Sequence, residues 1–188
     1  MPHITINDIQ DIQADNPGYG NIKVFIETGT HFGQTIFKIN SYFDKIHTIE
    51  IKEDIYNTVV NMAHTKESHP GSFQNINFHL GDSTYLLPKI LKNINEPCVF
   101  FLDGHYSHGI TGRGEKDTPL LEEVKAIEEF HNQSSIIIID DCGMFGKHDS
   151  EDDWSQITES NILNSFSRGK ISKYYTTGIR FIILLQKV

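Results

Sequence analysis

The sequence predicts an α/β fold whose sheet is doubly wound, mostly parallel and completed by a C-terminal antiparallel hairpin. Short apolar runs of strand length recur along the chain, and segments with helical spacing of apolar residues separate them. This alternation indicates a parallel sheet built from right-handed crossovers. The tail, "KYYTTGIRFIILLQ", departs from it, because its two strand-like runs flank the tight turn Thr177-Gly178. Strands joined by so short a turn are antiparallel neighbours.

Apolar runs predict the parallel strands, and several are apolar throughout, as expected for strands covered on both faces. They are Lys23–Glu27, Ile46–Glu50, Ile76–Leu80, Val99–Asp103 and Ile136–Asp140. The segments between and after them predict helices, because apolar residues recur there with helical spacing. These are Gln34–Tyr42, Ile55–Thr65, Thr84–Leu91, Leu120–Phe130 and Ser155–Phe166. Asp117-Thr118-Pro119 gives the fourth helix a start signal, since proline is favoured in a first helical turn.

Length and charge limit the class of protein. The 188 residues fit a single domain over 1–188, with residues 1–20 as a lead-in segment. A net charge of -9 without a Lys/Arg cluster argues against nucleic acid or an anionic membrane as partner. The start of the chain does not resemble a secretory signal, and the apolar stretches are too short to cross a bilayer. We therefore expect a cytoplasmic protein, for which a homodimer is an open alternative.

The stretch "FIETGTHFGQT" (25–35) raises the question of which ligand it holds. The pattern GxGxxG fails, because His31 and Gln34 stand where glycines are needed, and no Gly-Lys-Ser/Thr follows. What fits is E-x-G-x-x-x-G between a strand and a helix. Gly29 permits a tight turn and Gly33 a close approach of the helix. Glu27 and the N–H groups of the turn are then expected to hold a ligand with both an amine and a carboxylate.

This loop resembles motif I of class I S-adenosylmethionine-dependent methyltransferases, and the resemblance extends over residues 20–188. It implies a Rossmann-like, seven-stranded sheet whose sixth and seventh strands form the hairpin. Glu50, which ends the second apolar run, would accept both ribose hydroxyls. In "LGDSTYLLP", Asp82 would contact the adenine amino group and Ser83 its edge. The implied cofactor-binding residues are Glu27, Thr28, Gly29, Thr30, Gly33, Thr35, Glu50, Asp82, Ser83 and Asp103. Taken singly, the acids also fit plain structural roles, such as a helix N-cap for Asp82.

Acidic residues also end two adjacent predicted strands. Converging carboxylates such as Asp103, Asp140 and Asp141 repel one another unless a cation or a proton neutralises them. A divalent ion with oxygen ligands, most often Mg²⁺, is one solution, and anchoring of a loop is the structural alternative. The same residues resemble the metal-dependent sugar and small-molecule O-methyltransferases. That resemblance implies Asp103, Asp140 and Asp141 as metal ligands, and a catalytic group of His105 as base with Asp103 and His108. The alternative for His105 is a hydrogen-bonded loop histidine.

The sequence thus predicts a methyltransferase that uses S-adenosyl-L-methionine, with Mg²⁺ as an optional second cofactor. The expected acceptor is a hydroxyl of a small molecule or carbohydrate. One alternative is a cofactor-binding or scaffold protein of the same fold without turnover. The other is a nicotinamide-dependent oxidoreductase, which the missing GxGxxG disfavours. In the polar loops 104–119 and 141–154, we expect Tyr106 and Trp154 to form an apolar lid. The histidines at positions 3, 47, 64, 69 and 131 are expected at the surface.

Overall fold

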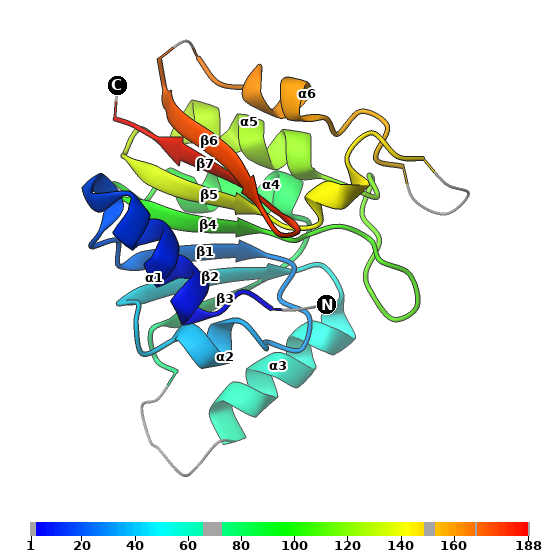
Figure 1. Ribbon diagram of the computed structural model, residues 1–188. Coiled ribbons are helices and arrows are strands. Elements are labelled where there is room, and N and C mark those ends of the chain that lie inside the picture. Colours follow the sequence, from blue (N-terminus) through cyan, green and yellow to red (C-terminus); the bar gives the residue numbers. More distant parts are fainter. Residues whose placement is uncertain (1–2, 66–72, 149–152, 168, 188) are drawn as a thin grey trace.

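The computed structural model describes residues 3–65, 73–148, 153–167 and 169–187, which form one seven-stranded sheet (Figure 1). The strand order is β3-β2-β1-β4-β5-β7-β6. The strands are β1 (Val24–Thr28), β2 (Lys45–Glu50), β3 (Ile76–Leu80), β4 (Cys98–Leu102), β5 (Ser135–Ile139), β6 (Ile171–Thr177) and β7 (Arg180–Leu185). β1 to β5 pair in parallel, whereas β7 is antiparallel to both β5 and β6. The predicted mostly parallel sheet with a C-terminal hairpin is confirmed.

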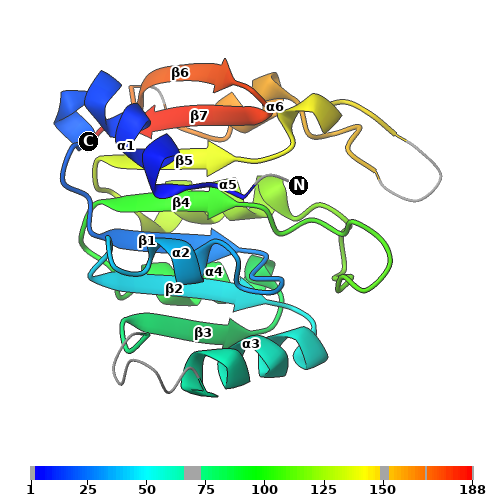
Figure 2. The ribbon, with the colours of Figure 1, turned by 60° about the horizontal axis from the view of Figure 1, so that its bottom comes forward.

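Helices cover both faces of the sheet, as the doubly wound prediction requires (Figure 1 and Figure 2). They are α1 (Ile6–Asp15), α2 (Ile36–Ile39), α3 (Glu53–Thr65), α4 (Ser83–Leu91), α5 (Leu120–Phe130) and α6 (Glu159–Leu163). α1, α2 and α3 pack with one buried apolar cluster, and α4, α5 and α6 pack with another. Because side chains alternate along a strand, Phe25 enters the first cluster and Val24 and Ile26 the second.

Three helices differ from the prediction. α1 arises in the lead-in segment, where Thr5 and Asp8 form a capping box. α2 covers only part of 34–42, since His31 and Gly33 have positive φ and the chain before it turns instead. α6 is shorter than 155–166. Its N-cap is Thr158, whose side chain accepts a hydrogen bond from the Asn161 N–H, while Ile157 before it is buried in the core.

The expected surface position of the histidines is wrong for His131. Its side chain is 0% exposed, and its Nε2 lies 2.7 Å from Ser135 Oγ. His47 is half-buried, with its Nδ1 3.0 Å from His79 Nε2 on the next strand. His69 lies outside the described residues. Among the described helices, none has the length and apolar character that a membrane span requires.

Candidate functional site

A cavity of about 350 Å³ opens at the carboxyl ends of the parallel strands. Its wall comes from four successive strand ends: Gly29, Thr30 and Thr35 after β1, Glu50 and Ile51 at β2, Asp82 and Ser83 after β3, and Asp103 and His105 after β4. Figure 2 shows the loops after β4 and β5 at this same edge of the sheet. Open α/β sheets place their ligands here. The structure thus brings together most of the residues predicted to bind the cofactor.

Both glycines of the loop after β1 are needed for the reasons that the sequence suggested. Gly29 has φ 84°, and a Cβ there would lie 2.3 Å from the Asp103 carbonyl oxygen. Gly33 has φ 71°, and a Cβ there would lie 2.7 Å from the Phe37 ring. Any other residue would be strained and would push the loop away from β4 or α2. Gly33 supports the loop without lining the cavity.

The N–H groups of this turn are committed within the protein. The N–H groups of Gly29 and Thr30 both donate to the Ile49 carbonyl, at 2.9 and 3.1 Å. The His31 N–H donates to Glu50 Oε2 at 2.8 Å. For the N–H groups at 29 to 31, the expectation that the turn would hold the ligand is wrong, because their hydrogen bonds hold the loop against β2.

Glu50 is buried at the cavity wall, with each carboxylate oxygen held by one backbone donor. Oε2 accepts from His31 as above, and Oε1 accepts from the Lys52 N–H at 2.9 Å. A carboxylate oxygen has two lone pairs, so each oxygen keeps one for a ligand hydroxyl. The fixed orientation and the free lone pairs suit recognition of a vicinal diol.

Glu27 lies beneath the cavity wall, with only 1% of its surface exposed. Its Oε2 accepts from Thr48 Oγ1 at 2.7 Å, and Thr35 donates a second side-chain hydrogen bond. Burial raises the pKa of Glu27 to about 8, and nearby Glu50 adds to the rise, while the threonine hydrogen bonds oppose it. Thr28 is likewise buried and outside the lining. Thr30 and Thr35 therefore stand between Glu27 and any ligand.

Asp82 serves as both helix cap and cavity wall. Its Oδ1 accepts from the Thr84 N–H at 2.8 Å and caps α4. A Cβ on Gly114 would lie 2.6 Å from Asp82 Oδ2, so the loop after β4 approaches this carboxylate closely. Ser83 Oγ donates to Glu123 Oε1 at 2.6 Å. Burial raises the pKa of Glu123 to about 7. Glu123, on α5, ties this part of the cavity wall to a second helix.

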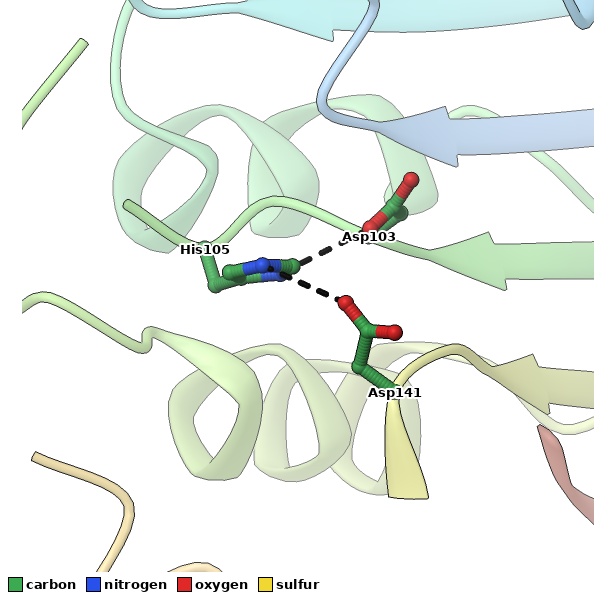
Figure 3. A group of neighbouring side chains, drawn as sticks. All are labelled: Asp103, His105 and Asp141. Atoms are coloured by element: carbon green, nitrogen blue, oxygen red, sulfur yellow. Dashed lines mark ion pairs between the residues drawn. The ribbon is translucent and has the colours of Figure 1, made fainter. Parts of the chain in front are cut away.

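His105 lies between two carboxylates, as Figure 3 shows. Its Nδ1 is 3.5 Å from Asp103 Oδ1, and its Nε2 is 3.5 Å from Asp141 Oδ2. Burial raises the pKa of Asp103 well above its usual range, and the charges of Asp140, Asp141 and Glu27 raise it further. Asp103, His105 and Asp141 each offer a ligand atom within 4.8 Å of the others. A group of this kind can hold a cation or share a proton.

Of the described residues, Asp140 and His108 do not belong to this group, although the charge of Asp140 still raises the pKa of Asp103. Asp140 is buried, and its Oδ1 is 3.4 Å from Arg180 Nε on β7. Burial raises the pKa of Asp140, and Arg180 opposes the rise. His108 stands further along the loop with φ 65°, and its ring centroid is 5.2 Å from that of Tyr106. The structure thus joins His105 with two of the three predicted metal ligands.

The loop after β4 rests on the cavity mouth. Lys52 Nζ donates to the Ile110 carbonyl at 2.6 Å, and a Cβ on Gly112 would lie 2.3 Å from Ile51 Cγ2. Tyr106 lines the cavity, as a lid residue should. The lid role predicted for Trp154 is wrong. Trp154 is 2% exposed and packs against His105 from the core side, with 5.0 Å between ring centroids.

The residues in or behind the cavity wall that sequence reasoning missed include Thr48, Ile51 and Glu123. Thr48 had a weak signal, because it is a polar residue in a buried strand, two positions before Glu50 and so on the same face. Ile51 directly follows Glu50. Glu123 had no signal, since a charged residue in the first turn of an amphipathic helix is ordinarily at the surface.

No family model matches the sequence, and no curated protein is significantly similar to it. Solved structures share its fold. An rRNA methylase from Streptococcus thermophilus matches with a TM-score of 0.58 and 13% identity, covering 100% of this chain and 99% of that one. A Streptococcus mutans protein described as a methyltransferase, in complex with SAH, matches with a TM-score of 0.58 and 14% identity, and 100% of both chains is covered. A Staphylococcus aureus protein described as a caffeoyl-CoA O-methyltransferase matches with a TM-score of 0.61 and 11% identity, covering 99% of this chain and 84% of that one.

At these identities the likeness establishes the fold. The match to these structures extends over nearly the whole chain, including the strands β5, β7 and β6 of the C-terminal hairpin region. The chain has the Rossmann-like methyltransferase fold.

Proposed function

We propose that this protein is an S-adenosylmethionine-dependent methyltransferase. The observation that carries the proposal is the succession of Glu50, Asp82 and Asp103 from three strand ends around one cavity. Its volume of about 350 Å³ falls in the range of small-molecule sites, about 300–1,000 Å³. A structural neighbour that this chain matches over its full length was solved in complex with SAH, which supports the same kind of ligand here.

The electrostatics of the cavity favour a cationic cofactor. Burial raises the pKa of Glu27 and of Asp103, and Glu50 and Asp140 respectively add repulsion. Excess carboxylate in a poorly hydrated site is relieved by a bound cation. S-adenosylmethionine carries both a sulfonium and an ammonium group. A nicotinamide cofactor brings two phosphates, which the acidic cavity and the absent GxGxxG both disfavour.

The proposed acceptor is a hydroxyl of a small molecule or carbohydrate. The sulfonium is already activated, so catalysis consists of aligning the acceptor and removing its proton. Alignment contributes about 7–11 kcal/mol in favourable cases. His105, held between Asp103 and Asp141, is the proposed base, a role typically worth about 10²–10⁴-fold. Some structural neighbours are rRNA methylases, but the net charge of -9 speaks against RNA as acceptor.

As an alternative to the role of His105 as base, a divalent metal fits the group of Asp103, His105 and Asp141, with the imidazole as a ligand. Two carboxylates and an imidazole are ligands for Mg²⁺ or, because of the nitrogen, for Mn²⁺ or Zn²⁺. The raised pKa of Asp103 supports the fit, since a cation would favour its ionised form. A bound metal supplies Lewis acidity that lowers the pKa of an acceptor hydroxyl. Asp140, paired with Arg180, would then support Asp141 from behind.

Calorimetric titration with S-adenosylhomocysteine tests the proposal, with NADH as the comparison ligand. We expect saturable binding of S-adenosylhomocysteine and none of NADH. Transfer of a labelled methyl group to a panel of sugars and phenols then separates an enzyme from a scaffold protein that only binds the cofactor. Absence of heat at millimolar S-adenosylhomocysteine would overturn the proposal.

A further inference from the structure

A chain of buried hydroxyl groups connects Glu27 with the cavity. Thr48 Oγ1 donates to Glu27 Oε2 at 2.7 Å, and Thr30 Oγ1 lies 2.6 Å from Thr48 Oγ1. Glu27 and Thr48 are direct neighbours in the β1–β2 register, so the sheet itself fixes this pair. All three residues are buried, and of the three only Thr30 lines the cavity. Glu27 is thus connected to the cavity wall by hydrogen bonds through Thr48 and Thr30.

The direction of each hydrogen bond follows from the donors available. A hydroxyl has one hydrogen and two lone pairs, and a carboxylate only accepts. Thr48 gives its hydrogen to Glu27, so Thr48 accepts the hydrogen of Thr30. Thr35, which also lines the cavity, gives its hydrogen to Glu27 as well. Thr30 and Thr35 are thereby left with lone pairs and no hydrogen for a ligand.

The backbone near these threonines likewise offers few hydrogen-bond donors to a ligand. The N–H groups of Gly29, Thr30 and His31 are all bonded within the protein. At Thr30 and Thr35 the cavity wall therefore offers hydrogen-bond acceptors, with the buried carboxyl group of Glu27 behind them. A primary ammonium group, which has three donors and no acceptor, is the chemical complement of such a wall.

We infer that Thr48 is a positioning residue. Its hydrogen bond to Glu27 makes it accept the hydrogen of Thr30, so that Thr30 and Thr35 present lone pairs that bind the amino group of the ligand. This inference rests on the proposed function, because the ligand with an amino group is the adenosyl amino acid. The bound ammonium in turn favours the ionised form of Glu27. Thr48 itself touches no ligand.

A ligand pair that differs in the amino-acid part provides the test. S-adenosylhomocysteine carries the amino group, whereas 5′-methylthioadenosine has the same adenosyl thioether without it. Thr48→Val removes the hydroxyl at nearly constant shape, and Thr48→Ser keeps it. Thr58→Val is the matched control, because Thr58 donates to the Asp54 carbonyl on α3, outside the cavity. Affinities of the full chain for both ligands are measured by calorimetry.

We expect Thr48→Val to lower the affinity for S-adenosylhomocysteine about 3- to 10-fold, the effect of one hydrogen bond. The affinity for 5′-methylthioadenosine should change less than about twofold. Thr48→Ser and Thr58→Val should match the wild type. Glu27→Gln removes the charge and should show the same selective loss, so it provides the test if Thr48→Val does not fold.

Equal losses for both ligands would mean that Thr48 only supports the fold, and would overturn the inference, as would unchanged affinities. Failure of the wild type to bind either ligand would instead overturn the proposed function. The two failures are therefore distinguishable.

Discussion

The imidazole of His105 packs against the indole of Trp154, with ring centroids 5.0 Å apart and planes at 65°. The indole is buried behind the site, so His105 is held between it and the carboxylates of Asp103 and Asp141. Trp154 is the single tryptophan of the chain, and its fluorescence therefore reports on the surroundings of His105.

Binding of a paramagnetic ion at this group should quench the tryptophan fluorescence. We expect saturable quenching on titration with Co²⁺, since a metal bound by His105 lies close to the indole. Asp141→Asn removes one charged ligand and should raise the Co²⁺ concentration at half-maximal quenching roughly tenfold or more. Asp153→Asn, at an exposed acid outside the group, is the control. Identical curves for Asp141→Asn and wild type would contradict the metal site.

Gly29→Ala should destabilise the fold strongly. The alanine would have to adopt φ near 84° and place its Cβ 2.3 Å from the Asp103 carbonyl oxygen. Strain and loop displacement together should cost roughly 2–4 kcal/mol of unfolding free energy. Urea denaturation measures the loss. Gly18→Ala, where a Cβ meets nothing within 4 Å, should stay within about 0.5 kcal/mol of the wild type, and equal effects at the two positions would refute the steric explanation.

Stability should fall as the pH drops from 6.5 to 4, in part because of His131. Burial, helped by the charge of Lys170, lowers the pKa of His131 from 6.5 to about 4. The unfolded chain therefore binds a proton in this window that the folded chain does not, so unfolding is favoured as the pH falls. The contribution is on the order of 2–3 kcal/mol. Denaturation of wild type and His131→Gln at pH 7 and pH 4.5 isolates it. A difference between the two proteins that stays constant with pH would show that His131 does not titrate in this way.

Glu50→Gln should weaken adenosyl ligands through the ribose. The amide keeps one oxygen acceptor, but its NH₂ group replaces the carboxylate oxygen that accepts from His31 or from Lys52. We expect an affinity loss of roughly 10- to 100-fold for S-adenosylhomocysteine and for 5′-methylthioadenosine alike, since both carry the ribose. This equal loss contrasts with the selective loss expected at Thr48. A loss confined to one ligand would contradict the assignment of Glu50 to the ribose.

Strand-end positions made much of the site predictable. Glu50, Asp82 and Asp103 each lie at the end of an apolar run or just after it, and parallel strands bring their carboxyl ends to one edge, so their convergence on the cavity follows from the sequence. The glycines at 29 and 33 were predictable for a local reason, because the turn between a strand and a helix needs positive φ there.

Features that depend on side-chain direction were not predictable. Adjacent Asp140 and Asp141 look equivalent in sequence, but Asp141 takes φ 53° and turns toward His105 while Asp140 faces Arg180. The partnership of Thr48 with Glu27 depends on the register of β1 against β2. Trp154 lies beside a run of acidic residues that suggests solvent, yet the loop carries it into the core.

A crystal structure with S-adenosylhomocysteine would show whether the acids at the strand ends bind an adenosyl cofactor. We predict the ribose hydroxyls at Glu50, the adenine between Ile51 and the loop after β4 with its amino group toward Asp82, and the amino-acid nitrogen at Thr30 and Thr35. A ligand bound elsewhere, or an adenosyl group turned away from Glu50 and Asp82, would contradict this claim.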